Sequence, residues 1–151
     1  RKLGQNCGSN FQAFMTDIAN FAEANKSHPA LAKEIAMLSG ASEAVMQVAM
    51  GMLGWSQSDR ASLVALNANR FLLMMSQLAV AWLLLDAAVI SDESAAKLPE
   101  THVDRSFYEG KRASAQWYAR NVLPDVEGAA KKAALEDTAP IDISDAAFAT
   151  S

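Results

Sequence analysis

Apolar residues recur along this chain at steps of three and four, the spacing of one face of an α-helix. The clearest case is residues 10–25, whose apolar face consists of Phe11, Phe14, Met15, Ile18 and Ala22. Ser9 or Asn10 can cap the start of this helix, since both residue types accept a hydrogen bond from the first turn. No stretch shows sustained period-two alternation, so the sequence predicts an all-α protein without a sheet.

Three further helices are predicted, over residues 29–56, 58–90 and 104–136. Pro29 suits the first turn of the second helix, where its missing N–H would be unpaired anyway. Gly40 is a possible break, and the pattern leaves open whether residues 29–56 form one helix or two. The helices therefore occupy most of the chain and alternate with short connections.

The third predicted helix carries the strongest apolar signal of the chain. Ser58 can cap its start, and the polar stretch 91–102 after it predicts an exposed connection. Its second half, residues 71–90, would span about 30 Å, long enough to cross a bilayer. Gln77 lies near its middle and Asp86 near its end, which favours a central bundle helix buried on all sides over a membrane span.

The fourth predicted helix contains Pro124, which removes a backbone hydrogen bond and predicts a kink. Its apolar stripe consists of Tyr108, Ala115, Tyr118, Val122, Val126, Ala129 and Ala133. Four long amphipathic helices joined by short connections predict an antiparallel, up-and-down four-helix bundle. We expect residues 1–151 to form this single domain, with a short polar tail after Asp137.

Composition agrees with a globular domain: 51% of the residues are hydrophobic, 20% are charged and the net charge is −4. A mildly acidic chain without a basic cluster predicts neither nucleic-acid binding nor attraction to an anionic membrane. Cys7 is the single cysteine, so no internal disulfide is possible. The start at Arg1 has no initiator methionine and no apolar leader, so we expect a cytoplasmic protein of which this chain is a part.

Candidate catalytic and metal residues do not form the required patterns. A di-iron bundle needs Glu-x-x-His on two helices, but Glu100 lies two residues before His102, and His28 has no glutamate three residues before it. Ser27 beside His28 is not triad geometry. The seven methionines lie among other apolar residues without accompanying histidines, which indicates core filling. Cys7 indicates an incidental thiol. We therefore predict no catalytic, cofactor-binding or metal-binding residue in this chain.

The fourth helix also carries two distinctive segments, Phe107-Tyr108-Glu109-Gly110-Lys111 and Trp117-Tyr118-Ala119-Arg120-Asn121-Val122-Leu123-Pro124. Gly110 and Ser114 would let a neighbouring backbone come close. The two rings that open the second segment would face a partner helix or domain. An ordinary packed bundle helix is the alternative, and periodicity does not choose between the two.

These segments, with Asp104 before them and Ala147-Phe148 near the end, resemble the C-terminal helical domain of bacterial acyl-CoA dehydrogenases. The resemblance is to the long type typified by 3-methylmercaptopropionyl-CoA dehydrogenase. There the last helix carries Phe-Tyr-x-Gly-Lys and then Ala-x-x-Tyr/Phe-Ala-x-x-Val-Leu-Pro. The start, Arg1-Lys2-Leu3, is similar to the Gly-Arg-Lys continuation that follows the family's catalytic-domain helix.

The resemblance implies a parent flavoenzyme that uses FAD to desaturate an acyl-CoA at the α–β bond. Its catalytic base is a glutamate in an Ile-Tyr-Glu-Gly-Thr element, which would lie upstream of Arg1. Glu109 is followed by Gly110-Lys111 and stands in the wrong helix, so it takes no catalytic role. This chain would be inactive alone, would bind no FAD, and would pack on the catalytic core of the same polypeptide. The parent enzyme would act on acyl-CoA, and its family tends towards homodimers.

Two other functions remain open from the residues. One is a stand-alone helical protein-interaction module, which would show an exposed apolar patch. The other is a four-helix metal or cofactor bundle, which the lack of paired ligands disfavours.

Overall fold

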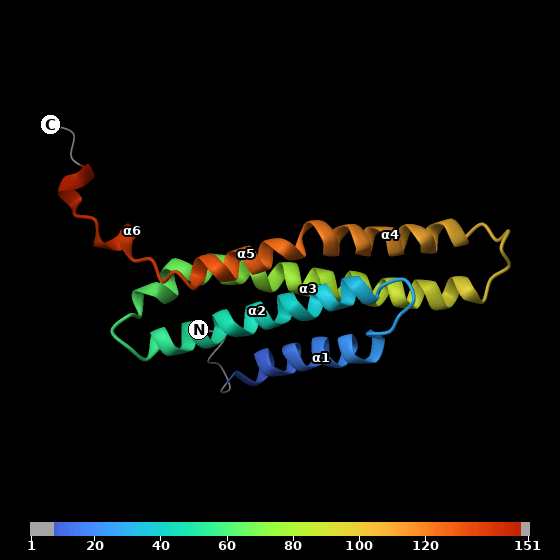
Figure 1. Ribbon diagram of the computed structural model, residues 1–151, viewed down its shortest axis with the longest axis horizontal. Helices are drawn as coiled ribbons and strands as arrows, with labels where there is room; N and C mark the ends of the chain where they lie inside the picture. Colours follow the sequence, from blue (N-terminus) through green and yellow to red (C-terminus); the bar gives the residue numbers. More distant parts are fainter. Residues whose placement is uncertain (1–7, 149–151) are drawn as a thin grey trace.

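The computed structural model describes residues 8–148 and consists of helices and short connections (Figure 1). The elements are α1 (Ser9–Asn25), α2 (Ala32–Ser56), α3 (Ser62–Ala96), α4 (Arg105–Asn121), α5 (Leu123–Ala133), α6 (Ala139–Asp142) and the 3₁₀ turn η2 (Asp145–Phe148). No β-strand occurs between residues 8 and 148, so the predicted all-α class is confirmed.

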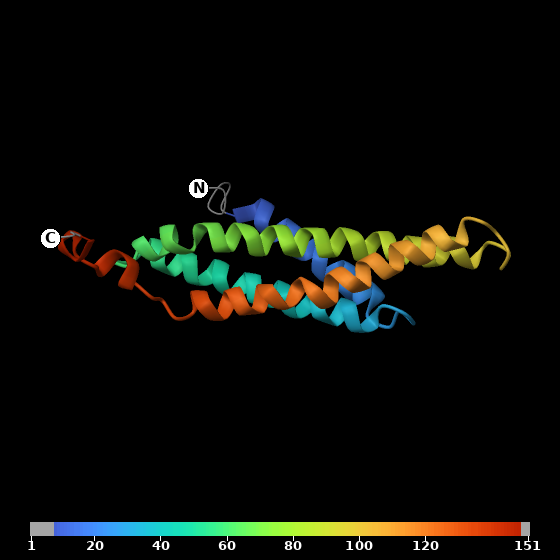
Figure 2. The ribbon, with the colours of Figure 1, turned by 90° about the horizontal axis from the view of Figure 1, so that it is seen from above.

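The long helices lie alongside one another in an elongated bundle (Figures 1 and 2). α3 packs against α2, α4 and α5, and α2 packs against α1 and α5. The chain turns back at the connection between α2 and α3, and again between α3 and α4 (Figure 1). Beyond α5 the tail leaves the end of the bundle, and neither α6 nor η2 contains a buried residue.

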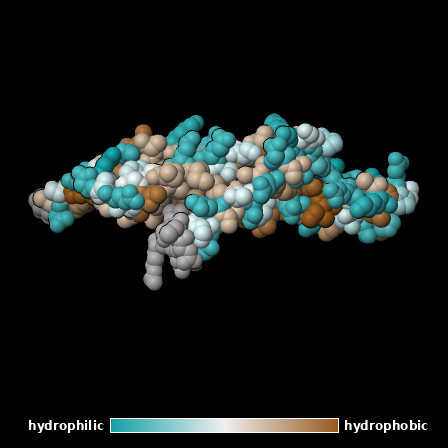
Figure 3. Space-filling model, turned by 90° about the horizontal axis from the view of Figure 1, so that it is seen from below, coloured by the Kyte–Doolittle hydropathy of each residue, from teal (hydrophilic) through white to brown (hydrophobic). Residues whose placement is uncertain are grey.

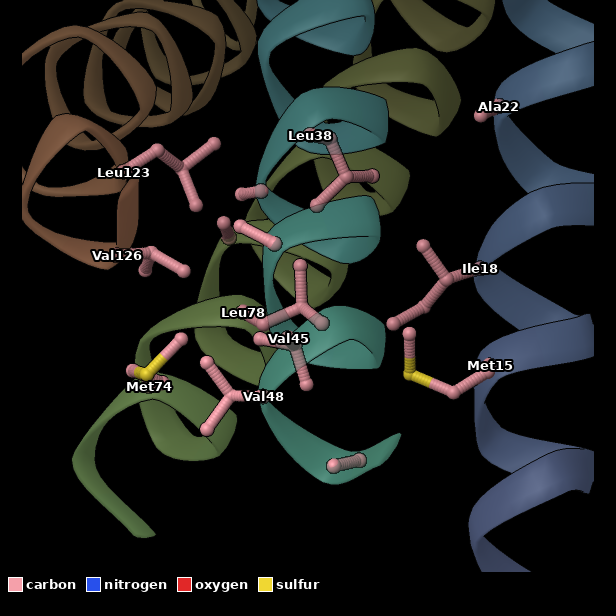
Figure 4. Packing of buried hydrophobic residues seen from close by; sticks show 14 of the residues in the cluster. Met15, Ile18, Ala22, Leu38, Val45, Val48, Met74, Leu78, Leu123 and Val126 are labelled. Carbon is pink, nitrogen blue, oxygen red and sulfur yellow. The ribbon is translucent and has the colours of Figure 1, made fainter. Parts of the chain in front are cut away.

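The core forms where apolar side chains of four helices meet (Figure 4). α1 contributes Ile18, α2 contributes Leu38 and Val45, and α3 contributes Leu78, all fully buried. α5 closes the cluster with Val126, which is also 0% exposed. Each such side chain stabilises the fold by about 1.5–3 kcal/mol through the removal of apolar surface from water.

The first two helices follow the prediction closely. α1 matches residues 10–25 within one residue, although no side chain caps its start. α2 is one continuous helix through Gly40, which settles the question left open by the sequence. Its start was predicted wrongly, because Pro29 lies in a turn where Leu31 and Ala32 both donate their N–H groups to the His28 carbonyl, at 3.3 and 3.1 Å. The regular helix therefore begins only at Ala32.

The start of the third helix was also predicted wrongly. Ser58 does not cap α3, which begins at Ser62 without a side-chain cap. The Ser58 hydroxyl instead donates to the Trp55 carbonyl at 3.1 Å and accepts the Arg60 N–H at 3.2 Å. Ser58 thus organises the turn between α2 and α3.

The end of the third helix lies six residues beyond the predicted Ile90, at Ala96. Ser91 is buried within the helix, and its hydroxyl donates to the Ala87 carbonyl at 2.7 Å. The Arg105 guanidinium then donates to the Ala95 and Leu98 carbonyls, both at 3.1 Å. Ala95 belongs to the last turn of α3, whose carbonyls have no partner within the helix, and Leu98 lies just beyond it. Contacts with α4 therefore override the polar local sequence.

The predicted fourth helix is divided in two at Val122. α4 ends at Asn121 and α5 begins at Leu123, which places Pro124 in the first turn of α5. This position suits proline, because the N–H that proline lacks has no acceptor in a first helical turn. The Val122 N–H still donates to the Tyr118 carbonyl at 2.8 Å, so the two helices follow each other almost without a gap.

The prediction that α3 is buried on all sides was wrong. Its inner face is buried against the other helices, but five large apolar residues on the outer side are 41–67% exposed: Leu72, Leu73, Val80, Leu83 and Ile90. We call these five residues the open stripe of α3. It remains uncovered because the described helices pack against other sides of α3.

Candidate functional site

A buried ion pair joins α2 to α4. Glu34 lies in the first turn of α2 with its side chain 1% exposed, and Arg120 near the end of α4 donates to it from Nε at 2.7 Å. One turn earlier, the Gln116 amide donates to the Ala30 carbonyl at 3.0 Å. These contacts fasten the connection between α1 and α2 onto α4. The Glu34 carboxylate is closed to any substrate, so its role is to hold the two helices together.

A second polar cluster lies around Asp92 on α3. Arg112 of α4 donates to the Asp92 carboxylate at 3.0 Å, and His28 Nε2 lies 3.9 Å from its other oxygen. His28 also accepts the Ala30 N–H through Nδ1 at 3.3 Å, which shapes the turn before α2. This cluster connects three parts of the fold, and the sequence offered no signal for it because its members lie far apart along the chain.

His102 lies in the connection before α4, away from the Asp92 cluster. Its Nδ1 accepts the Asp104 N–H at 3.2 Å, the geometry of a local turn. Between residues 8 and 148, no group of three or more His, Cys, Asp or Glu side chains is placed to hold a metal ion. Cys7 lies outside the described residues. Most methionines pack in or against the core, whereas Met50 is 61% exposed and does not fill it.

The third cluster surrounds Glu136, at the end of the bundle opposite the Asp92 cluster. The Trp55 indole donates to its Oε1 at 2.9 Å, and Arg60 pairs with its Oε2. These two hydrogen bonds hold the pKa of the Glu136 carboxyl below its ordinary value. Glu136 has a φ of 50°, in the left-handed region that non-glycine residues rarely adopt. Here the chain turns away from α5 into the tail.

Two grooves indent the surface. The larger, about 440 Å³, lies between α1 and α2 and is lined mainly by small side chains, with Glu23, Lys26 and Glu43 among the lining residues. The smaller, about 220 Å³, lies between α2 and α5 beside Trp55 and Glu136. Two hydroxyls line these grooves, those of Ser39 and Ser42, and neither bonds to a carboxylate or a histidine of the described residues; the Ser39 hydroxyl donates to the Ile35 carbonyl at 3.2 Å. Covalent catalysis needs a nucleophile that is bonded to a base.

The distinctive segments of α4 face outwards for the most part. Phe107 and Trp117 are 61% and 62% exposed, and the Lys111 ammonium lies 5.2 Å from the centre of the Phe107 ring. A Cβ added at Gly110 would meet no heavy atom within 4 Å, so the predicted close approach at Gly110 and Ser114 is not found within the described structure. Glu109, excluded from catalysis above, is exposed on this helix.

The close packing of α4 comes from two other residues. Ala115 and Ala119 are the buried residues of the helix, at 1% and 0% exposure. Tyr118 beside them is half-buried, and this burial raises the pKa of its hydroxyl. Of the two predicted aromatic rings, therefore, Tyr118 packs against the core and Trp117 points to solvent.

The fold and these clusters define the class of the protein: an all-α bundle domain whose buried and half-buried charges bind helices to one another. Comparison with known families identifies the family of this domain. The profile described as "Acetyl-CoA dehydrogenase C-terminal like" matches residues 14–144, most of the chain. The chain belongs to this family of acyl-CoA dehydrogenase C-terminal domains, as its fourth-helix motif predicted.

Individual relatives of the chain support this family assignment. The chain is 36% identical over 148 residues to a butyryl-CoA dehydrogenase of Syntrophomonas wolfei, covering 98% of this chain and 24% of the relative. A second butyryl-CoA dehydrogenase of that organism is 30% identical, covering 94% of this chain and 23% of the relative. A broad-specificity linear acyl-CoA dehydrogenase of Mycobacterium tuberculosis is also 30% identical, covering 98% and 25%. The chain thus spans about a quarter of the length of these relatives. The narrower similarity to 3-methylmercaptopropionyl-CoA dehydrogenase stays a prediction.

Proposed function

We propose that this chain is the C-terminal structural domain of an FAD-dependent enzyme that desaturates an acyl-CoA thioester at its α–β bond. The observation that carries the proposal is the family match over residues 14–144, together with relatives that are acyl-CoA dehydrogenases about four times as long. The domain packs on the catalytic core of the same polypeptide and supports it without touching the reacting atoms.

The chemistry belongs to the remainder of the parent. There a glutamate would act as the base that removes the proton α to the thioester, and FAD would supply the hydride-accepting chemistry. The larger groove offers little to FAD: it is lined by Ala, Ser and two Ile side chains, two glutamates and a single lysine. A pyrophosphate is bound by free helix N-terminal N–H groups or several cations. This lining holds one lysine, and the N–H of Ala32 at the start of α2 already donates to the His28 carbonyl. We assign no catalytic, flavin-binding or metal-binding role to any residue of the chain.

The arrangement of helices supports a finer description. We infer an up-and-down four-helix bundle in which α1, α2 and α3 are the first three members and α4 with α5 forms the fourth, bent near Pro124. Residues 1–151 would form this one domain. The parent would be cytoplasmic and form homodimers, as expected from the sequence and its family.

Helices α2 and α3 are long and apolar enough to cross a membrane, by length and composition alone. Both also pack on several other helices of the bundle, and Glu34 of α2 is paired with Arg120 of α4. These contacts support a bundle outside the bilayer.

The coding sequence before Arg1 tests the proposal. It should encode an acyl-CoA dehydrogenase core that contains a base of the Ile-Tyr-Glu-Gly-Thr type. An upstream sequence without such a core would overturn the proposal. The purified 151-residue chain should also retain no FAD and turn over no acyl-CoA. Measurable dehydrogenation by this chain would contradict the proposal that catalysis resides in the rest of the parent enzyme.

A stand-alone helical interaction module is the second candidate, and the open stripe of α3 is the observation that favours it. A coding sequence that begins at this domain, with its own start codon, would support this candidate.

A further inference from the structure

The open stripe follows one side of α3 for about 27 Å, at 1.5 Å per residue from Leu72 to Ile90. Its residues are separated by steps that keep them on one side of a helix: seven from Leu73 to Val80, three to Leu83 and seven to Ile90. Ser76 and Ala87 lie on the same side between them and leave shallow spaces between the large side chains. This pattern of large and small residues is typical of a helix face that packs against a second surface.

The opposite side of α3 is buried in the bundle core. Met74, Leu78 and Leu85 are 0% exposed in the bundle core. The open stripe is therefore a second apolar face of the same helix, with Leu72 67%, Leu83 59% and Ile90 55% exposed. Large exposed apolar side chains aligned along one side of a helix mark a contact surface.

The beginning of the described chain lies beside α3. Phe11 of α1 lies 6.3 Å from Phe71 between ring centres, and Phe14 lies 5.9 Å from Trp82 in an edge-on contact. Figure 2 shows the start of α1 on the α3 side of the bundle. α1 therefore covers the side of α3 that carries Phe71 and Trp82 and leaves the open stripe uncovered.

We infer that the open stripe of α3 is the face on which the catalytic core of the same polypeptide packs. The inference rests on the proposed function and adds the surface through which the domain acts. Two observations select this occupant: the family is one of C-terminal domains, and about three quarters of the relatives' length lies outside the match.

A bilayer fits the stripe less well. Helices that lie on membranes carry Lys and Arg along their polar side. α3 contains one basic residue, Arg70, against three acidic residues: Asp86, Asp92 and Glu93. Figure 3 shows hydrophilic and apolar residues mixed over the face seen from below, without a continuous apolar band. A second copy of the chain is the other occupant that the experiment must distinguish.

The test uses the full-length polypeptide and two matched variants, Leu83→Cys in the stripe and Leu135→Cys outside it. Leu135 is a leucine of even higher exposure, at 75%. Each purified protein reacts with a maleimide, and peptide mass spectrometry follows the rate at the introduced cysteine. We expect position 83 to react at least roughly tenfold more slowly than position 135, because the core covers it.

Each other outcome overturns the inference. Equal rates at the two positions, with position 83 as reactive as in the 151-residue chain, would show an uncovered stripe. Protection of position 83 that disappears when dilution dissociates an oligomer would identify a second copy as the occupant. Protection that requires phosphatidylcholine–phosphatidylglycerol vesicles would identify a bilayer.

Two further measurements keep the result interpretable. Carbene footprinting of the unmodified full-length protein compares labelling of the stripe with labelling of Leu135 and needs no variant, so it applies even if Leu83→Cys fails to fold. Reduction of the bound flavin by an acyl-CoA is measured on the same preparation. A protein that reduces its flavin but shows an uncovered stripe retains the proposed function and loses this inference; a protein without flavin reduction loses the proposed function itself.

Discussion

The Arg120 guanidinium on α4 holds the carboxylate of Glu34 on α2, which is 1% exposed and lies 86 residues away in the sequence. Removal of Arg120 leaves a buried carboxylate without its cation. We predict that Arg120→Leu lowers the free energy of unfolding by about 2 kcal/mol, less than for a fully buried pair because Arg120 is half exposed. Urea unfolding of the purified chain measures this change.

The double variant Glu34→Leu/Arg120→Leu is the matched control for that pair. It removes both charges and leaves no unpaired group in the contact, so it should lose less stability than Arg120→Leu alone. A double variant that is less stable than the single one would show that the pair contributes chiefly through packing.

The two apolar faces of α3 predict opposite results for the same substitution. Leu78→Ala should cost about 2–5 kcal/mol in the purified chain, because Leu78 is 0% exposed and its loss leaves a cavity. Leu83→Ala should change the stability of the purified chain by less than about 0.5 kcal/mol, because its side chain is 59% exposed there. Thermal and urea unfolding of the two variants, side by side, check the difference. Equal losses would mean that the open stripe is packed in the domain itself.

The contact of Glu136 with Trp55 and Arg60 is expected to be sensitive to acid. Hydrogen bonds from Trp55 and Arg60 lower its pKa from the ordinary 4.5, so the charged form is favoured in the folded state. Stability from this contact is present above pH 4.5 and is lost as the pH falls through the lowered pKa. The Trp55 environment should therefore change below pH 4.5, as followed by near-UV circular dichroism. Glu136→Gln should remove this acid transition, and its persistence in that variant would assign it to another group.

Gly110 is predicted to be replaceable with a gain in stability. It lies inside α4, and a Cβ at this position meets nothing within 4 Å. Gly110→Ala should therefore raise the free energy of unfolding by about 0.5–1 kcal/mol, because glycine loses more backbone freedom in a helix. Thermal unfolding of the purified chain checks this. A loss of stability confined to the full-length polypeptide would instead show that another surface lies against Gly110 there.

The tail after the bundle should be dispensable for its stability. α6 and η2 contain no buried residue, and Ile141, Ile143 and Phe148 remain exposed. Truncation after Thr138 keeps the Glu136 cluster and should shift the free energy of unfolding by less than about 0.5 kcal/mol. A larger loss would mean that the tail packs on the bundle.

The sequence alone was sufficient to predict the main helices and the family. Steps of three and four between apolar residues placed α1 and α2, and the motif at Phe107–Pro124 identified the C-terminal domain. The C-terminal end of α3 was beyond local reasoning, because packing extends the helix: Ser91 is buried in the bundle and Arg105 of α4 binds the Ala95 carbonyl. The predicted Ser58 cap failed for a local reason, since its hydroxyl bonds the Trp55 carbonyl and the Arg60 N–H in the turn before α3.

The spacing of apolar residues also could not distinguish the buried side of α3 from its exposed side. A helix that is apolar around its whole circumference gives no sign of which side its neighbours occupy, so Leu78 and Leu83 were indistinguishable in the sequence. The polar clusters were hidden for a different reason: Glu34 with Arg120, and Asp92 with Arg112, become neighbours only when the helices pack.

The central claim is that this domain belongs to a flavin-dependent acyl-CoA dehydrogenase whose chemistry lies in the rest of the polypeptide. The most direct measurement is the flavin absorbance of the purified full-length protein on anaerobic addition of acyl-CoA thioesters, beside the 151-residue chain treated with FAD in the same way. We predict a bound flavin that is bleached by acyl-CoA in the full-length protein, and neither retention nor bleaching with the chain alone. A full-length protein without flavin reduction by any acyl-CoA, or reduction by the isolated chain, would contradict the account.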